Sequence, residues 1–335
     1  MGRWVLDDGT VQVALVEHGA RLQSVLVPDR DGTRADVLLG FDDLAPYTGK
    51  GRSFGATVGR YANRLAHGRF RIDGVEHSVP VTDRGNALHG GLHPFSELLW
   101  TAHAVQGRRG VRFSLLSPDG DSGFPGALSV HVTYVLHDGA LTVETMATTD
   151  APTVLNLTNH AYWNLAGEGS GTIESHLLQV DAETFLPVDD TGLPTGEFRP
   201  VAGTPFDFRA PVPLGYHLHD DDPQLAASKG YDHCFVLSGE PGGARPASRA
   251  AQVVEEVSGR TLEVWTDQPG LQVFSGGGLA GTLVGKSGAV YGPGAGLALE
   301  AQAFPDSPNH PEFPSTLLLE GEEFHSVTEF RFGWA

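Results

Sequence analysis

Pairs of apolar segments joined by tight turns constrain the fold of this chain more than any other feature. Three such pairs occur, in residues 70–79 around Asp73-Gly74, in residues 134–143 around Asp138-Gly139 and in residues 253–266 around Ser258-Gly259. The two Asp-Gly turns predict β-hairpins, because a type I′ turn needs positive φ at both of its central residues. The third pair predicts strands over 253–257 and 261–266. These hairpins join strands that are adjacent and antiparallel.

The rest of the sequence extends the same pattern. Residues 11–27 alternate in the manner of a pair of strands and are followed by turn residues at 28–32. Only residues 222–229 favour a helix, and that segment is short. Gly and Pro together account for 66 of 335 residues, about a fifth, which suits many short strands and tight turns. The sequence therefore predicts an all-β, antiparallel architecture.

Length alone does not decide the number of domains, since 335 residues correspond to about two average domains while large β-sandwiches often exceed roughly 200 residues as one. Two Gly-rich segments, 167–171 and 238–249, could act as linkers. Each lies between strand-like segments of unchanged composition, so a surface loop is the simpler interpretation. We expect one domain over residues 1–335.

Charge and cysteine content exclude several classes of protein. The chain has 22 basic and 41 acidic residues, a formal net charge of −19, which argues against binding to nucleic acid or to anionic membranes. Cys234 is the only cysteine, so neither an intramolecular disulfide nor a multi-cysteine zinc site can form. No basic-then-apolar leader and no apolar segment of about 20 residues is present. These features predict a cytoplasmic protein.

The segment 155–165 is the richest in chemically useful side chains, with one histidine, two large aromatics and three asparagines. Its first half reads as the end of a strand and its second half leads into the glycine-rich turn. His160 is thus expected where a rigid element meets a loop, an arrangement that binds small polar ligands well. A histidine satisfied within the core is the alternative.

Two further turns carry polar side chains. Asn63 and Arg64 follow an apolar segment, and their donors and acceptors could hold neighbouring hydroxyls, although a surface arginine is the alternative. His89 precedes two glycines, which allow backbone to approach a ligand closely, although a surface-turn histidine is equally consistent. His89 and His93 have the spacing of a helical metal site, but Gly90-Gly91 would break that helix, so no metal is expected.

Two acidic residues complete the candidates. Asp232 stands at the entry of a strand, where it could accept hydrogen bonds from hydroxyls or form a turn. Glu300 interrupts an apolar strand, and a carboxylate there is unfavourable unless it is exposed, paired or functional. A functional role is favoured over an edge position.

Taken together, these segments resemble the aldose 1-epimerase family, and the resemblance spans essentially the whole chain. The matching segments, in the family's order, are GARLQSVLVPDRDG, GATVGRYANRLAHGRF, NALHGG, TNHAYWNL, YDHCFVL, TDQPGLQVFSG and LEAQAFPDSPNHPEFPS. The resemblance implies a β-supersandwich with an open sugar-binding cleft, an acid–base mechanism and no metal or organic cofactor.

The resemblance also implies roles for individual residues. Glu300 of LEAQ matches the general base, His160 of TNHAYWNL the general acid, and His89 of NALHGG a second histidine near the ring oxygen. The positions expected to hold the sugar are Asn63, Arg64, Tyr162, Asp232 and Gln272. Ala161 and Ala301 differ from the family at spacer positions. Gly277 stands where many members have an asparagine, which removes one possible polar contact.

Interconversion of α and β anomers requires a base at the C1 hydroxyl and an acid at the ring oxygen. Glu and His have ordinary pKa values of about 4.3 and 6.5, so modest tuning would allow an ionised Glu300 to face a protonated His160 across the sugar near neutral pH. Two alternatives remain open: a glycoside hydrolase using Glu300 and Asp232, and a non-catalytic sugar-binding protein. The sequence does not determine which aldose is preferred or whether the substrate is phosphorylated. It also does not decide between a monomer and a weak homodimer.

Overall fold

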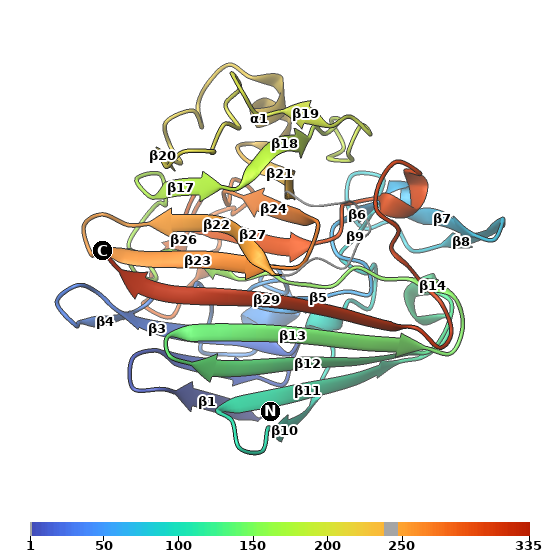
Figure 1. Cartoon of the computed structure of the whole chain (residues 1–335), viewed down its shortest axis with the longest axis horizontal. Helices are drawn as coiled ribbons and strands as arrows, with labels where there is room; N and C mark the ends of the chain where they lie inside the picture. Colours follow the sequence, from blue (N-terminus) through green and yellow to red (C-terminus); the bar gives the residue numbers. More distant parts are fainter. Residues whose placement is uncertain (1, 238–246) are drawn as a thin grey trace.

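Two large antiparallel sheets form the body of the computed structural model, which describes residues 2–237 and 247–335. The strands of the larger sheet run across the front of Figure 1. Its order is β10 (Thr101–Ala104), β11 (Gly110–Ser117), β12 (Leu128–His137), β13 (Ala140–Thr149), β29 (Glu323–Trp334), β23 (Arg260–Thr266), β22 (Ser248–Val254), β17 (Leu177–Val180) and β20 (Val212–Pro213).

The second sheet carries much of the candidate site. Its order is β16 (Tyr162–Trp163), β27 (Leu297–Gln302), β24 (Gly270–Phe274), β21 (Asp232–Leu237), β18 (Ala182–Leu186) and β19 (Arg199–Pro200). Almost every residue of strands β27 and β24 is buried, because both faces of these strands are covered.

Smaller sheets surround these two. A four-stranded sheet consists of β1 (Arg3–Asp7), β2 (Gln12–Val16), β3 (Arg21–Pro28) and β4 (Arg34–Asp36). The two-stranded pairs are β5 (Thr57–Val58) with β15 (Thr158–Asn159), β6 (Arg64–Leu65) with β9 (Ala87–Leu88), β7 (Arg69–Ile72) with β8 (Val75–Ser78), β14 (Thr153–Val154) with β28 (Leu317–Leu318), and β25 (Leu283–Val284) with β26 (Val290–Tyr291).

The all-β prediction is confirmed, and so are both Asp-Gly hairpins. β7 pairs with β8 and β12 with β13 in antiparallel register. Asp73 and Gly74 have φ of 49° and 81°, and Asp138 and Gly139 have 49° and 76°, so both turns have the positive φ that the sequence predicted.

The third hairpin forms with different bounds. Strand β22 ends at Val254, not at Val257, because the Glu255 carboxylate accepts hydrogen bonds from the backbone N–H groups of Val257 and Ser258. A side chain that captures local N–H groups competes with the strand ladder for them. The turn is therefore longer than predicted.

The short helix is confirmed as α1 (Pro223–Ser228). The Asp222 carboxylate caps it by accepting from the N–H groups of Gln224 and Leu225, and Lys229 ends it in the left-handed conformation. The loop at 167–171 is also present, whereas residues 238–246 of the other predicted loop lie outside the described residues. In the described part of the chain, no helix has the length and apolar character needed to cross a membrane.

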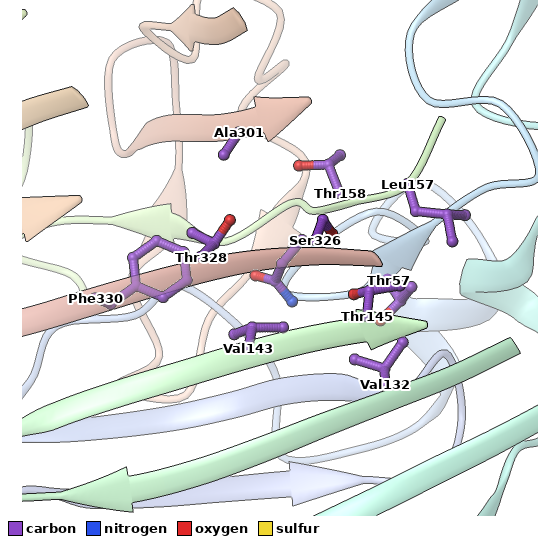
Figure 2. A pocket seen from close by; sticks show the side chains of 11 residues that line it. Thr57, Val132, Val143, Thr145, Leu157, Thr158, Ala301, Ser326, Thr328 and Phe330 are labelled. Atoms are coloured by element: carbon purple, nitrogen blue, oxygen red, sulfur yellow. The ribbon is translucent and has the colours of Figure 1, made fainter. Parts of the chain in front are cut away.

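A small polar cavity of about 20 Å³ lies between the two large sheets (Figure 2). Thr145 and Thr328 reach it from the larger sheet, while Thr158 and Ala301 reach it from the opposite side. This volume suffices for about one water molecule. Ala301 points into the cavity from β27, so its neighbour Glu300 projects from the other face of that strand.

Candidate active site

Glu300 lies in the middle of an interior strand. β27 pairs with β16 on one side and with β24 on the other, where Gln272 stands directly opposite Glu300. The Glu300 residue is only 2% exposed, and its Oε2 has no hydrogen-bond partner within residues 2–237 and 247–335. The alternative of an exposed edge position is therefore wrong. A carboxylate in such surroundings is unfavourable for stability, which favours a chemical role.

His160 is held between two short strands, β15 and β16. Its backbone N–H donates to the carbonyl of Ala56, and its own carbonyl accepts from the N–H of Gly55. The imidazole stacks on Tyr162 at 4.7 Å between ring centroids, and Tyr162 stacks in turn on Phe54 at 4.4 Å. Backbone and ring contacts together fix the orientation of the imidazole.

The structure brings His160 and Glu300 into direct proximity. The distance from His160 Nε2 to Glu300 Oε1 is 3.6 Å, and both side chains are buried. No sugar ring fits between groups this close, so the expectation that they face each other across a sugar is wrong. They lie side by side and present adjacent polar atoms to one cavity.

Burial shifts the pKa values of Glu300 and His160 in opposite directions. It raises the pKa of the Glu300 carboxyl well above 4.5, and the nearby Asp232 carboxylate adds to this effect while Arg64 opposes it. Burial lowers the pKa of His160 to about 4, with partial compensation by Asp232. The expectation of modest tuning is wrong for the free site, because desolvation favours a neutral Glu300 and a neutral His160.

A second histidine is fixed by the turn that contains Asn63. Both Asn63 and His89 adopt positive φ, 61° and 53°, a conformation in which Asn and His are enriched among non-glycine residues. The Asn63 N–H donates to His89 Nδ1 at 3.1 Å, and the His89 N–H donates to the Asn63 carbonyl at 3.0 Å. Since Nδ1 accepts, neutral His89 carries its proton on Nε2.

Burial, together with the adjacent His160 and Arg64, holds the pKa of His89 well below 6.5, so its imidazole is neutral. The two histidine rings are 5.4 Å apart in an edge-to-face arrangement. The glycine after His89 serves the backbone and not a ligand, because a Cβ at Gly90 would lie 2.0 Å from the carbonyl oxygen of Gly59. The surface-turn alternative for His89 does not hold.

Arg64 is buried, at 6% exposed, so the alternative of a surface arginine is wrong. Its Nε donates to Asp83 at 3.0 Å, and one terminal nitrogen lies 3.8 Å from Asp232. Asp232 also accepts from the amide of Gln272 at 2.7 Å. These contacts hold the Asp232 side chain in place. Asp232 is the first residue of β21, which confirms its predicted position at the entry of a strand.

A cavity of about 200 Å³ unites these residues. Seven of the eight predicted site residues line it: Asn63, Arg64, His89, His160, Tyr162, Asp232 and Glu300. Gln272 does not line the cavity but lies behind Asp232.

Three lining residues were not predicted: Ser53, Leu88 and Phe274. Phe274 was within reach of sequence reasoning, because it lies two residues beyond Gln272 and so shares its strand face. No sequence pattern indicated Ser53 as a site residue, because it belongs to an irregular turn. Gly277 is outside the cavity lining, and a Cβ there would lie 1.9 Å from the carbonyl oxygen of Lys229, so no side chain fits at this position.

No group of three or more His, Cys, Asp or Glu side chains that could hold a metal ion is found among residues 2–237 and 247–335. The chemistry available is that of a buried carboxyl, two neutral imidazoles and fixed hydrogen-bonding groups. Fold and site thus define an all-β protein with an acid–base site for a small polar molecule.

Comparison with known proteins identifies the family. The family model for aldose 1-epimerase matches residues 2–331. Galactose mutarotase from Homo sapiens is 44% identical over 333 residues, 99% of this chain and 94% of that protein, and aldose 1-epimerase from Escherichia coli is 40% identical over 324 residues, 96% and 91% of the two chains. The chain belongs to the aldose 1-epimerase family.

Solved structures agree with this assignment. The GalM/aldose epimerase homologue from C. elegans superposes with a TM-score of 0.88 at 30% identity, covering 100% of this chain and 99% of that one. Galactose 1-epimerase from Lactobacillus acidophilus gives a TM-score of 0.85 at 31% identity, covering 98% and 93%. The predicted family and the predicted β-supersandwich are both confirmed.

Proposed function

We propose that this chain is an aldose 1-epimerase that interconverts the α and β anomers of free aldohexoses such as galactose and glucose. One observation carries the proposal: a buried carboxyl and a buried imidazole, 3.6 Å apart, open onto a cavity of about 200 Å³ with hydrogen-bonding walls. The names of the relatives, galactose mutarotase and aldose 1-epimerase, support the same reaction.

Glu300 is the base and His160 the acid in ring opening. The carboxylate removes the proton of the C1 hydroxyl while the imidazolium protonates the ring oxygen O5, so the C1–O5 bond breaks and C1 becomes an aldehyde carbon. Both oxygens are bonded to C1. An acid and a base that lie side by side can therefore each reach one of them.

The protonation states that burial favours for Glu300 and His160 are those of the open-chain intermediate. After ring opening the proton resides on Glu300 and His160 is neutral, which is the distribution that burial favours. Rotation about the C1–C2 bond then presents the other face of the aldehyde, and the same two groups close the ring with their roles reversed. Hydroxyl donors of the bound sugar would stabilise the ionised Glu300 that starts the cycle.

His89 assists at the ring oxygen as a neutral hydrogen-bond donor. Its Nδ1 is engaged by the Asn63 backbone, so its Nε2–H is the available proton. A neutral donor beside His160 does not repel the imidazolium that forms during the reaction. Tyr162 provides a wall below the His160 ring.

Arg64, Asn63 and Asp232 hold the sugar hydroxyls, and Gln272 supports Asp232 from behind. Of the described residues that line the cavity, Arg64 is the only Lys or Arg, and Asp83 and Asp232 already flank it. A phosphate group would lack a free cation there. A neutral monosaccharide is therefore the substrate we propose.

The remaining expectations extend this proposal. The site draws residues from position 63 to position 300, which supports one domain over residues 1–335. A net charge of −19 is consistent with a small neutral substrate and with no nucleic-acid or membrane partner. We propose a cytoplasmic monomer or weak homodimer that needs no cofactor or metal.

Polarimetry tests the function directly. Freshly dissolved α-galactose and α-glucose should reach their equilibrium rotation faster with the protein than without it. Release of reducing sugar from a glycoside would point instead to a hydrolase. Sugar binding with no change in the rate of rotation would indicate a non-catalytic binding protein.

A further inference from the structure

Gln302 is a fully buried side chain to which the proposed mechanism gives no role. It is 0% exposed, and neither its Nε2 nor its Oε1 has a hydrogen-bond partner among the described residues. Buried amides are almost always hydrogen-bonded, because leaving the group unpaired is unfavourable. The presence of a polar residue at this position calls for an explanation.

The strand register places Gln302 beside the proposed base. Side chains alternate along β27, and Figure 2 shows Ala301 pointing from this strand into the cavity between the large sheets. Glu300 and Gln302 therefore project from the opposite face, about 7 Å apart along the strand. Gln272 of β24 stands opposite Glu300 on that face, and Gly270 stands opposite Gln302.

Three residues on this face of the sheet carry buried polar atoms that have no hydrogen-bond partner among the described residues. These atoms are Glu300 Oε2, Gln272 Oε1 and both polar atoms of the Gln302 amide. Two are acceptors with no donor, and the Gln302 amide offers two donor hydrogens and one acceptor. A water molecule can bridge polar groups at such a separation as effectively as a direct hydrogen bond.

We propose that Gln302 is a positioning residue for Glu300: its amide, together with Gln272, holds one or more internal water molecules that donate to Glu300 Oε2. The proposal rests on the proposed function, in which Glu300 is the base. With Oε2 held in this way, Oε1 is left to face His160 and the C1 hydroxyl. A donor to the carboxylate also stabilises its ionised form, which counteracts burial.

Several other groups act on the same carboxyl from the surrounding elements. The titratable and charged ones are His160 after β15, Tyr162 in β16, Arg64 in β6, His89 after β9, and Asp232 and Cys234 in β21. None of them changes when Gln302 is replaced, so a shift in the pH profile can be assigned to Gln302.

The kinetic test replaces Gln302 with methionine, which has a similar length and no hydrogen-bonding amide. Polarimetric kcat of Gln302→Met for galactose should fall about tenfold with KM within about twofold, and the acidic limb of the kcat profile should move up by about one pH unit. Val236→Ala is the matched control. Val236 of β21 pairs with Gly270, which pairs in turn with Gln302, so Val236 lies on the same face of the sheet but has no polar side-chain group. It should leave the profile in place.

A folded Gln302→Met protein whose kcat and pH profile equal those of Val236→Ala would overturn the proposal. A crystal structure of the unmodified protein at about 1.5 Å resolution tests it even if the variant does not fold. Water within hydrogen-bond distance of both the Gln302 amide and Glu300 would support it, and an amide bonded only to other protein groups would refute it. Failure of the proposed function would be seen separately, as an unmodified protein that does not accelerate mutarotation.

Discussion

Replacement of Glu300 by glutamine should abolish catalysis and yet stabilise the fold. Glutamine matches the shape of the side chain but cannot remove a proton from the C1 hydroxyl. General base catalysis typically contributes ~10² to ~10⁴ in rate, which corresponds to about 3 to 5 kcal/mol of transition-state stabilisation. We expect kcat to fall by at least that factor, while KM for galactose changes little because the cavity keeps its volume.

The stability effect follows from the burial of the carboxyl. Its pKa is raised in the folded protein, so the ionised form is disfavoured and stability is lost as pH rises above about 4.5. A neutral glutamine does not have this cost. At pH 7.5 we expect Glu300→Gln to be more stable by roughly 1–3 kcal/mol, and at pH 4 the difference should nearly vanish.

Two measurements on one protein sample test both halves of this prediction. Polarimetry of fresh α-galactose gives kcat and KM, and thermal unfolding at pH 4 and pH 7.5 gives the change in stability. Glu320→Gln, which changes an exposed glutamate, is the matched control and should alter neither quantity. Retention of more than a tenth of the activity, or a variant less stable than the parent at pH 7.5, would refute the assignment of Glu300 as a buried base.

Three further predictions concern His160 and Arg64 of the site and His176, a buried histidine outside the cavity lining. His160→Asn should lower kcat by ~10² to ~10⁴ with sugar binding still measurable by calorimetry, and near-normal polarimetric rates would remove His160 from its role. Arg64→Met should raise KM about tenfold or more with a smaller effect on kcat, because Arg64 holds the sugar and Asp232 but transfers no proton; an unchanged KM in steady-state polarimetry would contradict this. Burial lowers the pKa of His176 to about 4, and its Nε2 accepts from the Leu165 N–H. Stability should therefore fall by roughly 3 kcal/mol as pH drops from about 6.5 to about 4, and His176→Gln should flatten this part of a denaturation–pH curve. The same slope in the variant would count against it.

The candidate site shows which features of a site are local in origin. Asn63, His89, Asp232 and Glu300 each stood out because a polar side chain occupied a turn or interrupted a strand, and the structure places all four around one cavity. The resemblance to a family added the roles that local patterns could not assign. Ser53 escaped prediction because an irregular turn has no periodicity that would indicate where its side chain points.

Distances and protonation were beyond sequence reasoning for a different reason. The 3.6 Å separation of His160 and Glu300 depends on the packing of β15 against β27, which are far apart in the chain. The shifts in pKa depend on how completely water is excluded, and no single segment determines that. Two expectations that failed were of this kind: that the acid and the base lie on opposite sides of the sugar, and that their pKa values need only modest tuning.

The sequence by itself determined the strand-rich fold, the two Asp-Gly hairpins and the capped helix, because these depend on backbone preferences of neighbouring residues. Tertiary structure alone decided that a carboxyl at position 300 and an imidazole at position 160 are adjacent and buried, with pKa values shifted in opposite directions. Proximity and dielectric environment arise only when strands from distant parts of the chain pack together, and the chemistry of this site depends on both.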